Sequence, residues 1–116
     1  MPNLMPTDIK DEVRNILEDI PANPGGHPYV TAYQIMERLS ETTKNRLIAE
    51  RGRPGKDSGK YYAAANVVSD AAEMIHGIDI AFLETSNMRI LLNDEPIITP
   101  GNQNVGLYRI IITRTA

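Results

Sequence analysis

Cysteine is absent from these 116 residues, and its absence excludes several kinds of chemistry. Without thiols the chain has no disulfide, no thiolate metal site and no cysteine nucleophile, which fits a reducing compartment. No run of about 18 apolar residues occurs, so we expect no membrane-spanning segment. The first six residues have neither the basic nor the apolar region of a signal peptide, and a cytoplasmic location is therefore expected.

Aromatic residues are also scarce, with five tyrosines, one phenylalanine and no tryptophan. The core must therefore consist mainly of Ile, Leu, Val, Met and Ala. The hydrophobic share of 41% and the charged share of 23% are close to globular averages, so we expect a folded chain. Its length predicts a single domain over residues 1–116.

The net charge of −3 is unevenly distributed along the chain. Residues 1–43 carry −4, residues 44–60 carry +4 and residues 61–116 carry −3. A protein that coats nucleic acid without sequence preference would be basic overall, and this chain is acidic. Any contact with phosphate groups is therefore expected to be local.

Apolar residues recur with a helical period through the first two-thirds of the chain. The pattern predicts helices over about 8–20, 31–39, 41–51 and 60–76. Thr31 and Gln34 have the spacing of a capping box, Ser40 can cap the third helix, and Gly77 is typical of the residue after a helix. Proline and glycine predict loops over 21–28 and 52–60.

After Gly77 the apolar period becomes two, which is typical of strands. We predict a hairpin of strands at about 78–83 and 88–92, a short strand at 97–98 and a last strand over 107–113. The fold class is therefore α+β, with about four N-terminal helices followed by a small antiparallel β-sheet.

The stretch Ile110–Ile112 is apolar on both faces of its predicted strand. It is either a central strand covered on both sides or a strand whose face or edge pairs with another subunit. A homodimer through this C-terminal strand is therefore one of our expectations.

The order of elements resembles the winged-helix form of the helix-turn-helix proteins. The residues that carry the resemblance are Tyr29–Leu39, in the second helix and its entry, and Tyr61–Ala71, in the fourth. The chain departs from that family because residues 40–59 form a large insertion between the paired helices. In other respects the chain resembles small proteins of bacteria or mobile elements.

The resemblance implies that the fourth helix enters the major groove of double-stranded DNA and that a β-hairpin acts as the wing. Asp70 and Glu73 repel phosphate, so only the N-terminal half of this helix is expected to face DNA. The residues assigned to nucleic-acid binding are Lys44, Arg51, Arg53, Lys56, Lys60, Tyr62, Asn66 and Arg89.

Different roles are expected for these residues. Lys56 and Lys60 would hold phosphates, Asn66 would read a base, and Arg89 would be the wing residue. In an alternative assignment the helix over 41–51 is the reader, and Lys44, Asn45 and Arg51 make the contacts. The predicted function is a DNA-binding, transcription-regulator-like protein. The alternative is a small protein-interaction or accessory module of unknown partner, for which a homodimer is one expectation.

No pattern of residues predicts an enzyme, a metal site or a cofactor. Gly55–Lys60 departs from a P-loop, because Pro54 and Tyr61 stand where that motif needs glycine and Ser or Thr. The acidic residues Asp79, Glu84, Asp94 and Glu95 are expected to be solvated rather than to bind metal. Of the two histidines, His27 lies in a loop and His76 fits the C-terminal end of a helix, and neither has an evident catalytic partner.

Overall fold

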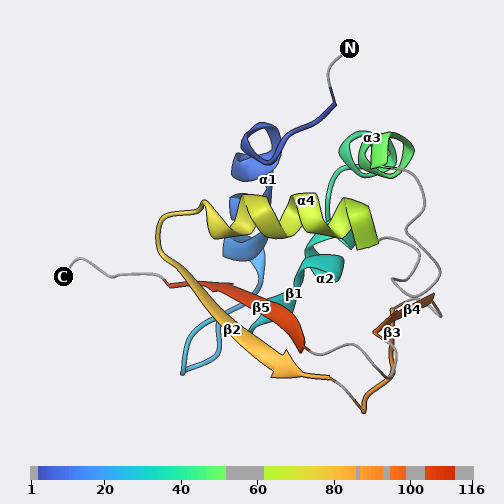
Figure 1. The fold of residues 1–116 in the computed structure, drawn as a ribbon. Coiled ribbons are helices and arrows are strands. Elements are labelled where there is room, and N and C mark those ends of the chain that lie inside the picture. Colours follow the sequence, from blue (N-terminus) through green and yellow to red (C-terminus); the bar gives the residue numbers. More distant parts are fainter. Residues whose placement is uncertain (1–2, 52–61, 86, 93–94, 99–103, 112–116) are drawn as a thin grey trace.

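The computed structural model describes residues 3–51, 62–85, 87–92, 95–98 and 104–111 (Figure 1). Its helices are α1 (Pro6–Asp19), α2 (Ala32–Glu37), α3 (Glu41–Arg51) and α4 (Tyr62–Glu73). Its strands are β1 (Val30–Thr31), β2 (Ile78–Glu84), β3 (Ile90–Leu92), β4 (Glu95–Ile98) and β5 (Asn104–Ile110). The predicted α+β class, with four helices and a small antiparallel sheet, is confirmed within these residues.

Helix α1 begins at Pro6, before the predicted start. Proline suits the first turn, where its missing N–H is not needed, and the Asp8 carboxylate accepts a hydrogen bond from the Met5 amide at 2.8 Å. The buried face holds Ile9, Val13 and Leu17, as the apolar period predicts.

Local capping sets the start of α2 and α3. The Thr31 hydroxyl accepts from the Gln34 amide at 3.2 Å, and the Gln34 side chain accepts from the Thr31 amide at 2.8 Å. The predicted capping box is therefore confirmed, although α2 ends at Glu37 rather than Leu39. The Ser40 hydroxyl accepts from the Thr43 amide at 3.3 Å, as expected of the residue before α3.

Helix α4 lies at the centre of the helical layer. Its buried side is rich in alanine, which lets α1 and α2 approach its backbone closely. It ends at Glu73 rather than at residue 76, because the last carbonyls are taken by tighter turns to the amides of Met74 and Ile75. Gly77 follows with a φ of 84°, a conformation that glycine adopts without strain.

The order of helices and strands differs from the prediction. Strand β1 lies between α1 and α2, so the strands do not all follow the helices. The three-stranded antiparallel sheet has the order β1-β5-β2, which places the last strand of the chain at its centre.

The predicted hairpin between 78–83 and 88–92 is wrong. Strand β2 pairs with β5 along its whole length, from Ile78 opposite Ile110 to Glu84 opposite Asn104, and β3 pairs with β4. Pairing with β5 gives β2 a partner for all seven of its residues, whereas β3 has only three. In this arrangement Tyr108 and Ile110 of β5 are buried against the helices.

The last strand also differs from its predicted range of 107–113. It runs from Asn104 to Ile110, and Ile110 is buried while Ile111 is exposed. The strand is central, as one of the two readings expected, but it is not covered on both sides, because the helices lie on one face (Figure 1) and Ile111 is 51% exposed. Strand β2 occupies one edge of β5 along its length, and β1 occupies the other edge at Leu107 and Tyr108, which leaves little of β5 for the predicted homodimer. Residue 112 lies outside the described residues.

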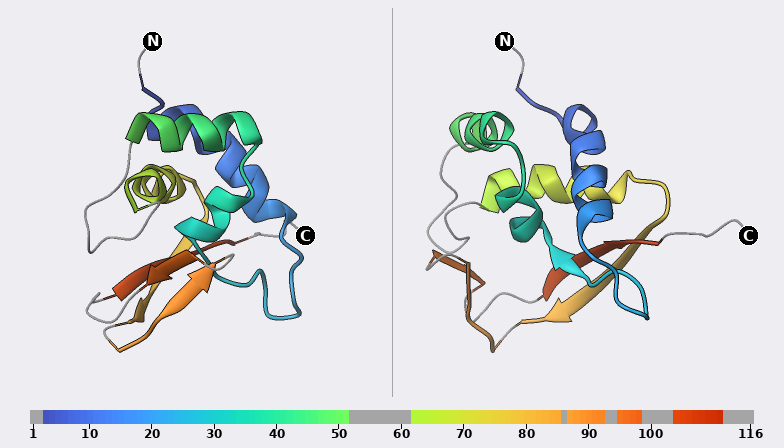
Figure 2. Two further views of the ribbon diagram at one scale, coloured as in Figure 1. Left: turned by 90° about the vertical axis from the view of Figure 1, so that its right-hand side faces the viewer. Right: turned by 180° about the vertical axis from the view of Figure 1, so that it is seen from behind.

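All four helices lie on one side of the sheet, and the core lies between the two layers (Figures 1 and 2). Tyr108 links the layers, because its ring is buried and its hydroxyl is hydrogen-bonded to Ser69 of α4. Gly106 makes room for this ring, since a β-carbon there would lie 2.6 Å from the Tyr108 oxygen. In the described part of the chain, no helix has the length and apolar character needed to cross a membrane.

Candidate functional site

The elements predicted to contact DNA lie at one end of the molecule. Strands β3 and β4 are part of the connection between β2 and β5. This connection and the N-terminal end of α4 are on the same side of the molecule in Figure 1 and in the right-hand view of Figure 2. Helix α2 packs directly against α4. Although α3 separates these two helices in the sequence, it packs above α4 and does not lie between them (Figure 2).

Two of the predicted cationic contacts, Lys44 and Arg51, have partners within the chain. The Lys44 ammonium lies 3.4 Å from the Glu37 carboxylate. The Arg51 guanidinium donates to the Leu4 carbonyl at 2.6 Å, and its Nε is buried. Both side chains therefore hold α3 in place, which weakens the alternative in which α3 reads DNA.

The end of α3 also holds the N-terminal segment through Glu50. Its carboxylate accepts the Leu4 amide at 2.7 Å. That hydrogen bond, with a smaller contribution from Arg46, lowers the pKa of Glu50. Leu4 is thus bound through both its amide and its carbonyl, and the helix end acts as an anchor.

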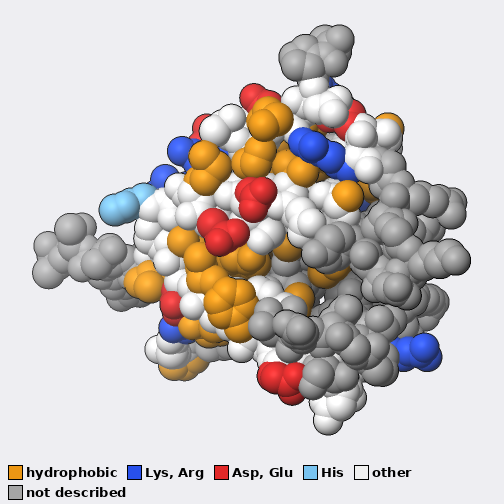
Figure 3. Space-filling view, in the orientation of Figure 1, with side chains coloured by type: hydrophobic (Ala, Val, Ile, Leu, Met, Phe, Trp, Pro, Cys, Tyr) orange, Lys and Arg blue, Asp and Glu red, His pale blue; other side chains and the backbone are white. Residues whose placement is uncertain are grey.

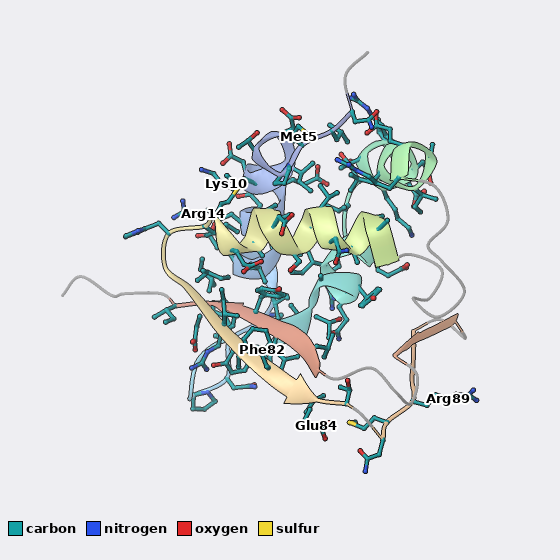
Figure 4. The ribbon with its side chains drawn as sticks, viewed as in Figure 1. Met5, Lys10, Arg14, Phe82, Glu84 and Arg89 are labelled. Carbon is teal, nitrogen blue, oxygen red and sulfur yellow. The ribbon has the colours of Figure 1, made fainter. Side chains whose placement is uncertain are left out.

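Asn66 and Arg89 are exposed, as nucleic-acid contacts must be. Asn66 lies on the first half of α4, and Arg89 projects from the connection between β2 and β5 (Figure 4). Tyr62 is the first residue of α4, but its side chain is not described. Arg53, Lys56 and Lys60 lie outside the described residues, so their predicted roles stay predictions.

The exposed side of α4 changes character along its length. Asp70 and Glu73 are both exposed on its second half. The space-filling view shows acidic side chains over α4 (Figure 3). Below them is apolar surface that includes Phe82 of β2 (Figures 3 and 4). The middle of α4 would therefore repel a phosphate backbone.

A cluster of Tyr29, Asp79 and Arg109 was not expected from the sequence. The Tyr29 hydroxyl donates to Asp79 at 2.5 Å, and Arg109 Nε donates to the same oxygen at 2.8 Å. The Arg109 guanidinium also lies over the Tyr29 ring, 4.5 Å from its centroid. The hydrogen bond from Tyr29, and to a smaller extent that from Arg109, lowers the pKa of Asp79.

This cluster corrects the view of Asp79 as a merely solvated acid. It joins the segment before β1 to β2 and β5 across the face of the sheet that is opposite the helices. The opposite charges of Asp79 and Arg109 were visible in the sequence. Their contact was not, because it depends on a register that pairs residues 30 positions apart.

The two histidines differ in their surroundings. His27 is buried, with its Nδ1 2.6 Å from the Ile20 carbonyl, so it donates there and fastens the loop after α1. It lines an open depression of about 730 Å³ beside Arg109, but its Nε2 is shielded and makes no hydrogen bond within the described chain. His76 is exposed in the turn after α4.

No group of three or more His, Cys, Asp or Glu side chains converges anywhere in the described ranges. Comparison of the chain with known protein families, with curated proteins and with solved structures finds no match. Its function must therefore be inferred from its own residues.

Proposed function

We propose that the protein binds double-stranded DNA through the end formed by the start of α4 and the connection between β2 and β5. One observation carries the proposal: α4 packs on the capped helix α2 and leads directly into β2, and the exposed Arg89 lies at the same end as the first turn of α4 (Figures 1 and 4). This arrangement resembles a recognition helix followed by a wing, which supports the proposal.

The charges on α4 restrict how DNA can approach. Asp70 and Glu73 keep the second half of the helix away from phosphates, so the helix would enter the groove by its N-terminal end. Asn66 is then the described side chain able to reach a base edge, with its amide suited to adenine. Arg89 would hold a phosphate or reach the minor groove beside it.

The segment before α4 supplies further support. Residues 44–60 carry +4 in an otherwise acidic chain, and they lead directly to the N-terminal end of this helix. Since Lys44 is paired and Arg51 is anchored, the contribution to phosphate binding must come from Arg53, Lys56 and Lys60. Transcription regulation is the biological role that such a protein would have.

The test measures affinity for a random-sequence 20-base-pair duplex by fluorescence anisotropy at several salt concentrations. We expect Lys56→Glu/Lys60→Glu to abolish binding and Arg89→Ala to weaken it about 5-fold. Loss of one phosphate contact should also reduce the slope of log affinity against log salt by about 1.

Arg14→Ala is the matched control, because Arg14 is an exposed arginine at the opposite side of the molecule (Figure 4). Its ion pair with Glu18 is long, at 3.8 Å, and both side chains are well exposed, so its loss should not affect folding. Absence of binding at about 50 mM salt, or equal effects of the two arginine substitutions, would contradict the proposal.

A further inference from the structure

An apolar strip lies along the open edge of the sheet. In the order β1-β5-β2, β2 pairs with β5 on one side, and no described strand pairs with its other side. Phe82 is 69% exposed and Ile80 is 37% exposed, which is unusual for large apolar side chains at neighbouring positions on one face. Figure 3 shows this surface, and Figure 4 marks Phe82 at its centre.

Both side chains are on the helix side of the sheet. Ile80 is opposite Tyr108 and Phe82 is opposite Gly106, and directly opposed residues of an antiparallel pair point to the same face. The core side of Ile80 is therefore packed near the helices. Phe82 is opposite Gly106 and is 69% exposed.

The main chain of β2 presents hydrogen-bonding groups at the same edge. The Ile111 amide donates to the Gly77 carbonyl at 2.8 Å, which makes this a hydrogen-bonded pair of the β2–β5 ladder. Such pairs alternate, so the next is Asp79 with Arg109. The N–H and C=O groups of Ile80 and Phe82 therefore point away from β5, and no described residue bonds to them.

The charge on the elements that form the strip is of one sign. Residues 62–84, which comprise α4, the turn after it and β2, contain four acidic residues and neither lysine nor arginine. Asp79 is paired with Arg109 on the other face of the sheet. Asp70 and Glu73 of α4 are exposed, and Figure 3 shows acidic side chains over α4 above the apolar surface. A ligand that complements this surface is apolar in the middle and basic beside it.

A second copy of the chain fits this edge poorly. Antiparallel pairing of two β2 strands requires a two-fold axis perpendicular to the sheet, which keeps both helical layers on the same side. The acidic sides of the two α4 helices would then face each other, and Asp70 and Glu73 would meet like charges. No basic side chain of α4 or β2 is present to offset that repulsion.

We propose that β2 binds an extended segment of a partner protein as an added strand. The main-chain groups of Ile80 and Phe82 pair with the segment, and one of its apolar side chains covers Phe82. An arginine or lysine two residues away lies on the same face of the added strand, within reach of Asp70 and Glu73. This surface adjoins the proposed DNA contact at Asn66, because Asp70 follows one helical turn later on the same side of α4.

The test uses a fluorescein-labelled peptide, Thr-Arg-Thr-Leu-Thr-Arg-Thr, in which leucine and arginine share one face of a strand. We expect saturable binding in fluorescence anisotropy at low salt. A peptide with glutamate in place of both arginines should bind at least 10-fold more weakly. A peptide that is N-methylated at the amides expected to pair with β2 should not bind.

Variants of the protein locate the surface. Phe82→Ala should weaken peptide binding about 10-fold, and Asp70→Asn/Glu73→Gln about 5-fold, with the second effect lost at about 1 M salt. Asp11→Asn, at an exposed acid of α1, is the matched control and should change nothing. Circular dichroism of each variant verifies that the fold is retained.

Each other outcome would overturn the proposal. Failure of the arginine peptide to bind at millimolar concentration excludes a basic added strand. Equal binding by the glutamate peptide, or by Phe82→Ala, places the contact elsewhere. A dimer in sedimentation equilibrium that dissociates in Phe82→Ala would show that the occupant is a second copy of this chain.

Discussion

The Tyr108 ring can occupy its position only because Gly106 has no side chain. The Tyr108 ring lies over Gly106 and carries its hydroxyl to Ser69 of α4. Burial raises the pKa of Tyr108, and the bond with Ser69 opposes that rise, so the hydroxyl is neutral and needs its partner. Glycine is required here for space rather than for backbone freedom.

We expect Gly106→Ala to lower the free energy of unfolding by about 2 kcal/mol. The added methyl group would displace the Tyr108 ring and break its hydrogen bond, leaving a buried hydroxyl without a partner. Urea denaturation measures the change. Gly25→Ala is the control, since a β-carbon at Gly25 meets nothing within 4 Å; equal losses in both variants would refute the explanation.

At the scale of elements, the cluster of Tyr29, Asp79 and Arg109 links strands on the face of the sheet that is opposite the helices. Its bonds connect three segments that are far apart in the sequence. The stacking of Arg109 on Tyr29 adds a contact that does not depend on the carboxylate. The register of β2 against β5 is therefore fixed from both faces, by Tyr108 on one and by this cluster on the other.

The cluster predicts a dependence of stability on pH. The folded pKa of Asp79 is lower than its unfolded value, so its contribution is present above the unfolded pKa of about 3.9 and is lost as pH falls through the folded pKa. Thermal unfolding should show a steeper loss of stability below about pH 4 for the wild type than for Asp79→Asn. Parallel pH profiles for the two proteins would show that the cluster does not stabilise the fold.

The helices could be predicted from the sequence because their signals are local. Thr31 and Gln34 are three residues apart, and the apolar positions of α1 and α4 repeat within a few turns. Strand pairing could not be predicted, because the partner of Ile78 is 32 positions away and a turn at 85–87 suggested a nearer one. The period of two identified the strands but did not identify their neighbours.

The candidate site was predictable only in part, for a related reason. Arg89 and Asn66 are exposed, as proposed contacts should be. Lys44 and Arg51 were chosen for their charge, but their partners Glu37 and Leu4 depend on how helices and the N-terminal segment pack. The exposure of Phe82 was also hidden, because an alternating strand pattern predicts that such a residue faces the core.

At the scale of the whole molecule, neighbouring surfaces differ in chemical character. The acidic and apolar side of α4 and β2 contrasts with the end that carries Arg89 (Figures 3 and 4). A chain with a net charge of −3 can therefore offer adjoining surfaces to an anionic and to a cationic partner.

Hydrogen exchange provides a test of this architecture. The amides of Asp79 and Ala81 bond to β5 and should exchange slowly, whereas those of Ile80 and Phe82 face the open edge and should exchange at least 10-fold faster. Leu107, Tyr108 and Arg109 should all be slow, because β5 is paired on both sides. Nuclear magnetic resonance resolves the individual amides, and uniform protection along β2 would mean that its outer edge is covered.

The central position of β5 also determines when the sheet can form. Strands β1 and β2 are not neighbours, and each finds its partner only in residues 104–110. As the chain leaves the ribosome, the helices can associate while both strands remain unpaired, and the pairing of β1 and β2 must wait for residues 104–110. Folding therefore ends with the closure of long loops, a step that is slow compared with the formation of the helices.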